Sequence, residues 1–128
     1  MAIPSGAGTE VIKSVGLEAV TDTDGYAITG VQYHIYVVLS ISVYCNTASK
    51  QMMVYLYMYD SFGSAANQYI NLFKTPSMGS SETFVYNDKF AFHGFGSNGA
   101  TQKLGFAGDA SADFDILVTY IDQDWTTP

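Results

Sequence analysis

The sequence contains no arginine, and its five basic residues, all lysines, are outnumbered by 12 acidic residues, which leaves a net charge of −7 over 128 residues. Proteins that bind nucleic acid or anionic membranes use clusters of basic side chains to neutralise phosphate groups. The scarcity of positive charge therefore argues against nucleic acid and against a membrane surface as partners of this chain.

Cysteine and long apolar runs are also scarce. Cys45 is the single cysteine, so no internal disulfide can form, and its place in an apolar alternating segment predicts a buried thiol. No run approaches the about 18 apolar residues of a membrane-spanning helix. Residues 1–8 carry neither the basic nor the apolar region of a signal peptide. We therefore expect synthesis and folding in a reducing cytoplasm.

Motifs for metal binding and catalysis are missing as well. His34, His93 and Cys45 are the only soft metal ligands, and their separations match no zinc spacing. Residues 22–25 (Asp-Thr-Asp-Gly) resemble the start of a calcium loop but lack its later ligands, which favours a turn. Residues 94–99 fit Gly-x-Gly-x-x-Gly without the strand and helix of a dinucleotide site. We expect no cofactor, no metal and no catalytic activity.

Alternating apolar residues, in contrast, are abundant in residues 34–45 and 52–59. One face of the first segment carries Ile35, Val37, Leu39, Ile41, Val43 and Cys45, and the other carries Tyr36, Val38, Ser40, Ser42 and Tyr44. In the second segment, one face carries Met52, Val54, Leu56 and Met58, and the other carries Met53, Tyr55, Tyr57 and Tyr59. This period of two predicts β-strands. We expect the faces that begin with Ile35 and Met52 to be buried in the core. We expect the tyrosine-bearing faces to contact other parts of the protein or a partner, and not water alone.

Turn-forming residues interrupt the chain about every 8–12 residues, a spacing typical of a β-sandwich or barrel. We predict an all-β fold, an antiparallel, jelly-roll-like β-sandwich of eight or nine strands, over residues 9–122. In this prediction residues 1–8 form a flexible N-terminal arm and residues 123–128 a C-terminal tail. The short polar connection at residues 46–50 predicts a hairpin between the two long strands, and residues 87–88 predict a tight turn.

Four segments together resemble small structural proteins of tailed bacteriophages, especially marine and cyanobacterial ones. They are residues 1–11 (Met-Ala-Ile-Pro-Ser-Gly-Ala-Gly-Thr-Glu-Val), the strand of residues 34–43, residues 84–90 (Phe-Val-Tyr-Asn-Asp-Lys-Phe) and residues 120–125 (Tyr-Ile-Asp-Gln-Asp-Trp). Such proteins are similar to β-sandwich cement or decoration proteins. Those sit on the outside of the capsid, often as trimers, and clamp neighbouring major capsid subunits with a flexible arm.

The resemblance implies that this chain is a virion structural protein, a homotrimer on the capsid exterior that bridges subunits of the major capsid protein. It implies partner-binding roles for Ile3 and Pro4 in the arm and for Trp125 in the tail. An alternative from another functional class is a receptor-binding or carbohydrate-binding module on a tail fibre or other part of the tail.

The remaining candidate residues are the tyrosines of the two long strands, for which three interpretations stay open. These candidates are Tyr36, Tyr44, Tyr55, Tyr57 and Tyr59. They can pack across strands within the monomer, or they can contact a partner, where tyrosine is enriched. In the third interpretation their rings stack on sugars, as the alternative function requires.

Overall fold

The computed structural model describes residues 9–59, 67–94 and 102–125, with only the backbone described for Tyr59 and Asn67. The predicted arm, with Ile3 and Pro4, lies outside the described part of the chain, as do residues 126–128.

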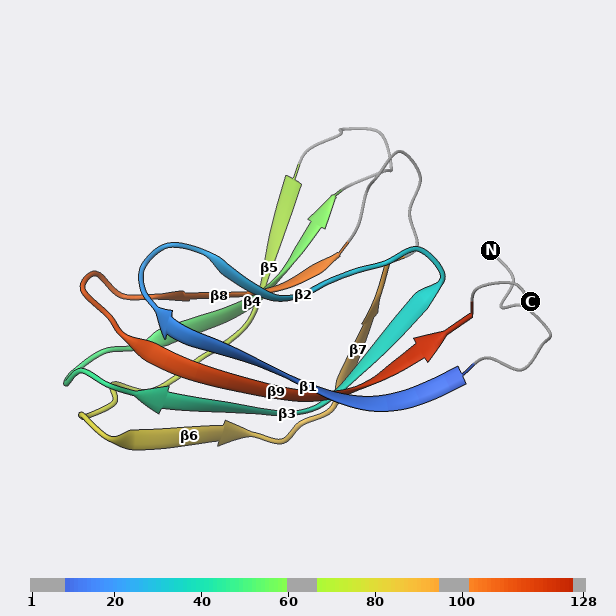
Figure 1. Cartoon of the computed structure of the whole chain (residues 1–128). Coiled ribbons are helices and arrows are strands. Elements are labelled where there is room, and N and C mark those ends of the chain that lie inside the picture. Colours follow the sequence, from blue (N-terminus) through green and yellow to red (C-terminus); the bar gives the residue numbers. More distant parts are fainter. Residues whose placement is uncertain (1–8, 60–66, 95–101, 126–128) are drawn as a thin grey trace.

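The described residues form nine strands in two antiparallel sheets that face each other (Figure 1). The larger sheet has the order β1 (Thr9–Val20), β9 (Phe114–Asp124), β3 (His34–Cys45) and β6 (Glu82–Tyr86), and β7 (Phe90–His93) also pairs with β3. The smaller sheet has the order β2 (Gly25–Thr29), β8 (Lys103–Gly108), β4 (Met52–Tyr59) and β5 (Asn67–Lys74). The prediction of an all-β sandwich is confirmed.

The topology is that of a jelly roll. β6 and β7 follow one another along the same edge of β3, β6 opposite Ile41–Cys45 and β7 opposite Ile35–Val38. Counted as one interrupted strand, they leave eight strand positions, four in each sheet. The chain then alternates between the sheets except at the β4–β5 connection, as in a double-sheet jelly roll.

Two of the predicted turns are wrong. β3 and β4 do not form a hairpin, because they lie in opposite sheets and residues 46–50 carry the chain from one sheet to the other. Residues 87–89 do not reverse the chain either, since β6 and β7 run in the same direction along β3. Polar residues mark where a strand ends but not where the chain goes next, and five residues can span the about 10 Å between packed sheets.

The buried core lies between the sheets and reveals a second error, in the facing of β3. The pairing of β3 with β9 shifts register between Val38 and Ser40, so Leu39 is the extra residue of a β-bulge. Before the bulge the buried side chains are Tyr36 (3% exposed) and Val38 (0%), and beyond it they are Ile41, Val43 and Cys45. Ile35 and Val37 therefore lie on the outer face, because one extra residue inverts the facing of a strand.

The predicted core face of β4 is confirmed for Met52, Val54 and Leu56, and so is the predicted burial of Cys45. Met52 and Val54 of β4 are fully buried, Leu56 packs against the core, and Cys45 is a buried free thiol. Phe114, Ile116 and Val118 of β9 are buried, and Tyr120 packs beside them. β9 continues to Asp124, so the first two residues of the predicted tail belong to the sheet. Among the described residues, no helix is long and apolar enough to cross a membrane.

Candidate interaction surfaces

The outer face of the larger sheet carries several exposed apolar side chains although it points away from the core. Four of its large side chains are exposed: Ile12 (70%), Val85 (51%), Leu117 (49%) and Tyr44 (36%). We call this surface, together with the partly buried Val37 and Ile121, the outer apolar face. Directly paired residues of antiparallel strands share a face. One row therefore runs Ile12–Ile121–Val37, and another runs Gly16–Leu117–Ser42–Val85. The polar row Ser14–Thr119–Ser40 lies between them. Exposed large apolar side chains that are rimmed by polar residues are a feature of interaction sites.

One end of the outer apolar face is hollowed. A depression of about 360 Å3 is lined by Gly16, Leu17, Glu18, Ser42, Tyr44, Asp115, Ile116 and Leu117. It exists because Gly16 and Ser42 flank Leu117 in its row and have little or no side chain. Tyr44 and Asp115 are direct cross-strand partners, so an aromatic ring and a carboxylate share one wall. We call this depression the Tyr44 hollow.

Asp115 also has a local structural role beside the Tyr44 hollow. Its Oδ1 accepts a hydrogen bond of 3.1 Å from the backbone N–H of Ala19. Ala19 has a positive φ of 53° in the bulged end of β1, where the pairing with β9 shifts register between Leu17 and Val20. A non-glycine residue is uncommon in this left-handed region, and the side-chain acceptor helps to hold it.

The outer face of the smaller sheet carries a cluster of tyrosine rings from β2, β4 and β5. The centroid of Tyr55 lies 6.4 Å from that of Tyr26 and 5.5 Å from that of Tyr69, and the Tyr57 and Tyr69 centroids are 5.2 Å apart. The planes of these pairs are inclined by 62–82°, so the rings meet edge to face and do not form one flat platform. Lys103 Nζ lies 5.1 Å from the Tyr26 centroid, within cation–π range.

Tyr55 is the centre of this cluster and is buried, with 4% exposure. Its hydroxyl has no hydrogen bond of ordinary geometry, although it lies beside Asp24 and Tyr26. Burial raises the pKa of Tyr55 above its usual range, and Asp24 and Tyr26 raise that pKa further. The phenol therefore stays protonated and acts as part of the packing. Tyr69, 53% exposed, is the accessible ring of the cluster.

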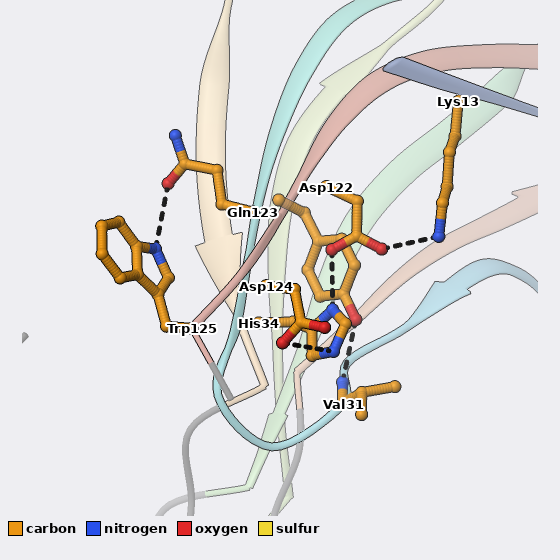
Figure 2. Close-up of polar contacts among 8 residues, drawn as sticks. Lys13, Val31, His34, Asp122, Gln123, Asp124 and Trp125 are labelled. Atoms are coloured by element: carbon orange, nitrogen blue, oxygen red, sulfur yellow. Dashed lines mark hydrogen bonds and ion pairs between the residues drawn. The ribbon is translucent and has the colours of Figure 1, made fainter. Parts of the chain in front are cut away.

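A polar cluster joins three strands of the larger sheet at the end where β9 finishes (Figure 2). Asp122, 7% exposed, accepts a hydrogen bond of 2.9 Å from Lys13 Nζ, and its other oxygen lies 2.7 Å from His34 Nδ1. His34 Nε2 lies 3.5 Å from Asp124 Oδ1. The hydrogen bond and charge of Asp122 raise the pKa of the Lys13 ammonium group. Lys13 of β1 and His34 of β3 thus provide the polar partners that a buried carboxylate requires.

Tyr36 connects this polar cluster to the loop before β3. The imidazole of His34 stacks on its ring at a centroid distance of 6.0 Å, and its hydroxyl accepts a hydrogen bond of 3.0 Å from the backbone N–H of Val31. Burial raises the pKa of Tyr36, so its hydroxyl remains protonated. Among the described residues, no group of three histidine, cysteine or acidic side chains is placed to hold a metal ion.

The structure separates the predicted site residues. Tyr36 lies in the core, stacked on Phe92 at 5.1 Å, and Tyr55 is buried among other tyrosines, so neither offers a surface to a partner. Both rings pack against other side chains of the monomer, as the first of the three interpretations expects. Tyr44 is exposed on the larger sheet and Tyr57 is partly buried on the smaller one.

The remaining predicted residues lie at or beyond the limits of the described chain. Trp125 is partly buried, and its backbone N–H donates a hydrogen bond of 2.8 Å to the carbonyl oxygen of Tyr33. In Figure 2 its indole reaches Gln123, with Nε1 3.5 Å from Oε1. Ile3, Pro4 and the side chain of Tyr59 lie outside the described residues, so their predicted partner-binding roles stay predictions.

Sequence reasoning missed the outer apolar face. Its signal is present in β9, where Ile116, Leu117 and Val118 place apolar side chains on both faces of the strand. A strand of a two-layer sandwich with one wet face should alternate apolar and polar residues. The break in alternation at Leu117 therefore marks the apolar outer surface, but the run resembles an ordinary core strand when read alone.

No family model matches the sequence, and no curated protein matches it. Among solved structures, one match is a Clostridium thermocellum chain with the CBM22-1–GH10 modules of endo-1,4-β-D-xylanase 10B, complexed with xylohexaose. The match covers 88% of this chain and 24% of that chain, with 13% identity and a TM-score of 0.51. Bacillus endospore appendages, described as disulfide-linked pili, match with 12% identity and a TM-score of 0.49 over 98% of this chain and 97% of theirs.

A virus-like particle of the extra small virus of the prawn Macrobrachium rosenbergii matches with 6% identity and a TM-score of 0.47, over 97% of this chain and 84% of its own. Other viral capsid proteins, a cyanophage capsid among them, are distant structural neighbours as well. This chain spans about a quarter of the xylanase chain that it matches. At these identities the likeness concerns the fold, a jelly roll.

Proposed function

We propose that this chain is a structural protein of a tailed-bacteriophage virion, which decorates the capsid exterior and stabilises the assembled shell by bridging major capsid subunits. The observation that carries the proposal is the outer apolar face, where Ile12, Val85 and Leu117 are each about half exposed or more. A jelly roll is a common fold of capsid domains, which is an argument by analogy. The acidic, arginine-free composition suits a capsid exterior and not a surface that faces packaged DNA.

The proposed mechanism is burial of apolar area at junctions between shell subunits. Each square ångström of apolar surface removed from water contributes about 25 cal/mol. A protein that binds only the assembled shell stabilises it by mass action. In this proposal the decoration protein is a trimer without catalytic activity, and its three copies raise the avidity for a symmetric site.

The test is co-sedimentation with capsids assembled from the major capsid protein of the same phage. Leu117→Lys places a charge on the outer apolar face, and we expect it to weaken capsid binding at least tenfold. The matched control is Ile70→Lys on β5 of the smaller sheet, because Ile70 is 46% exposed and Leu117 is 49% exposed. Equal binding by both variants and the native chain would overturn the proposal. Light scattering of the native chain tests the trimer.

The tyrosine cluster of the smaller sheet favours a second candidate, a carbohydrate-binding or receptor-binding module of a phage tail. Aromatic rings stack on sugars, and Tyr69 is exposed at the edge of the cluster. The fold likeness to the xylanase chain, whose structure contains xylohexaose, also supports this candidate. It predicts saturable glycan binding by the isolated chain that is lost in Tyr69→Ala and kept in Ile70→Ala.

A further inference from the structure

We propose that the Tyr44 hollow receives an arginine side chain of a partner protein. The inference deepens the proposed function, on which it rests, because it names the side chain through which a shell protein would anchor to the outer apolar face. The hollow suits an arginine side chain in its shape, in the charge of its lining and in the aromatic ring of its wall.

The shape comes from strands that lie far apart in the sequence. Gly16 on β1, Leu117 on β9 and Ser42 on β3 are neighbours in one row of the larger sheet. A Cβ built at Gly16 would meet its nearest neighbour, the carbonyl oxygen of Ile116, at an ordinary contact distance of 3.7 Å. The space above Gly16 is therefore open, and the whole hollow, of about 360 Å3, admits a long side chain.

The charge of the lining favours a cation. Glu18 and Asp115 are the charged residues among the eight that line the hollow, and both are acidic. Asp115 already accepts the Ala19 N–H through Oδ1. A carboxylate has lone pairs for further donors, and the bidentate fork of a guanidinium suits it. The chain has no arginine of its own, so this side chain must come from another protein.

The wall and floor fit the rest of an arginine side chain. Tyr44 is 36% exposed and lies opposite Asp115 in the pairing of β3 with β9. A guanidinium that binds the carboxylate is thus placed to stack on the phenol ring, a contact that arginine makes more readily than lysine. Leu117, beside Gly16, offers apolar surface to the methylene stem.

The probe is Nα-acetyl-L-arginine amide, titrated into the isotope-labelled full chain and followed by amide chemical shifts. Its neutral control is Nα-acetyl-L-citrulline amide, which has a similar shape without the charge. We expect saturable shifts at Gly16, Tyr44 and Leu117 with the arginine probe and at least tenfold weaker binding of the citrulline probe. Equal shifts with both probes, or none at these residues, would overturn the inference.

Two variants separate occupancy of the hollow from unspecific charge attraction. Gly16→Val fills the hollow without changing charge, and Glu18→Gln removes one exposed carboxylate without changing shape. We expect each to weaken the arginine probe at least fivefold, whereas Asp88→Asn, an exposed residue between β6 and β7, should leave binding unchanged. Equal losses in Glu18→Gln and Asp88→Asn, with unchanged binding by Gly16→Val, would reduce the effect to net charge and overturn the specific site.

A xylo-oligosaccharide is titrated in parallel, and shifts of the same amides by the sugar alone would replace the arginine assignment by a sugar site. These measurements need no capsid, so their failure can be told from failure of the proposed function. If the arginine probe fails while Leu117→Lys still abolishes capsid binding, only the inference about the Tyr44 hollow is lost. If the probe binds and native capsid binding is absent, the proposed function is lost.

Discussion

The ring of Tyr55 occupies the space that a side chain at Gly105 would fill. A Cβ built at Gly105 would lie 2.5 Å from Cζ of Tyr55, and the two residues are direct partners in the pairing of β4 with β8. The glycine thus lets a large ring lie against the outer face of the smaller sheet, where Tyr26 and Tyr69 enclose it. This contact explains how a residue on an outer face becomes buried.

Gly105→Ala should therefore destabilise the fold. The added methyl group must displace the Tyr55 ring, and overpacking of this kind costs about 1–3 kcal/mol. Gly16→Ala is the matched control, because its Cβ meets only an ordinary contact, and we expect it to be neutral or stabilising by about 0.5–1 kcal/mol. Chemical denaturation of both variants provides the comparison. Equal free energies of unfolding for the two variants would show that the Tyr55 ring moves away from the added methyl group without cost.

Tyr55→Phe should make the protein less sensitive to alkali. Because burial raises the pKa of Tyr55 in the folded chain, the folded state holds this proton more tightly than the unfolded state. The resulting stability is complete below about pH 10, the usual tyrosine pKa, and is lost as the pH rises beyond it. Removing the hydroxyl removes this contribution, so the free energy of unfolding should fall less steeply with pH.

In Tyr55→Phe the free energy of unfolding should still fall at high pH, but by less than in the native chain. The remaining fall comes from Tyr36 and Lys13, whose pKa values are raised as well. At neutral pH the variant should be as stable as the native chain, since the hydroxyl has no hydrogen bond of ordinary geometry. Urea unfolding at a series of pH values measures both expectations. A native chain whose stability does not change above pH 10 would contradict the assignment.

The two long strands show how much of this fold the sequence can predict. Alternation located the two long strands at residues 34–45 and 52–59, because a buried face imposes a period of two wherever a strand crosses the core, and the spacing of turns gave the number of strands as eight or nine. Alternation failed at Leu39, since Val38 and Leu39 are both apolar and the bulge leaves no interruption in the apolar run. Tyr36 and Tyr44 therefore have the same parity in the sequence but lie on opposite faces of the sheet.

The candidate site was less accessible to prediction than the fold. Tyr44 was predicted as a partner-binding residue, but Gly16 and Asp115, which share its hollow, were not associated with it. They are brought together by the pairing of β1 with β9, whose residues are separated by about a hundred positions, as in the contact between Ser14 and Thr119. A local sequence pattern identifies each strand, but it does not specify which distant strand will lie beside it in the sheet.

Substitutions on either side of the bulge test the facing of β3. Val38→Ala should lower the free energy of unfolding by about 2 kcal/mol, because Val38 is fully buried and its loss leaves a cavity. Val37→Ala removes the same atoms from the partly buried outer face and should cost less than about 1 kcal/mol. Thermal and urea unfolding give the two values. The reverse order of costs would restore the facing that alternation predicts.

Among the described residues, Asp122 should be the charged residue whose loss lowers the free energy of unfolding most, because it is buried. Asp122→Ala leaves Lys13 and His34 without their shared carboxylate and should lower the free energy of unfolding by about 2 kcal/mol, because one partner of a buried charge network is removed. Asp124→Ala is the matched control on the same strand. Its side chain is 40% exposed, so we expect a cost below about 0.5 kcal/mol. Equal costs for the two variants would show that the buried contacts of Asp122 with Lys13 and His34 add no stability at this end of β9.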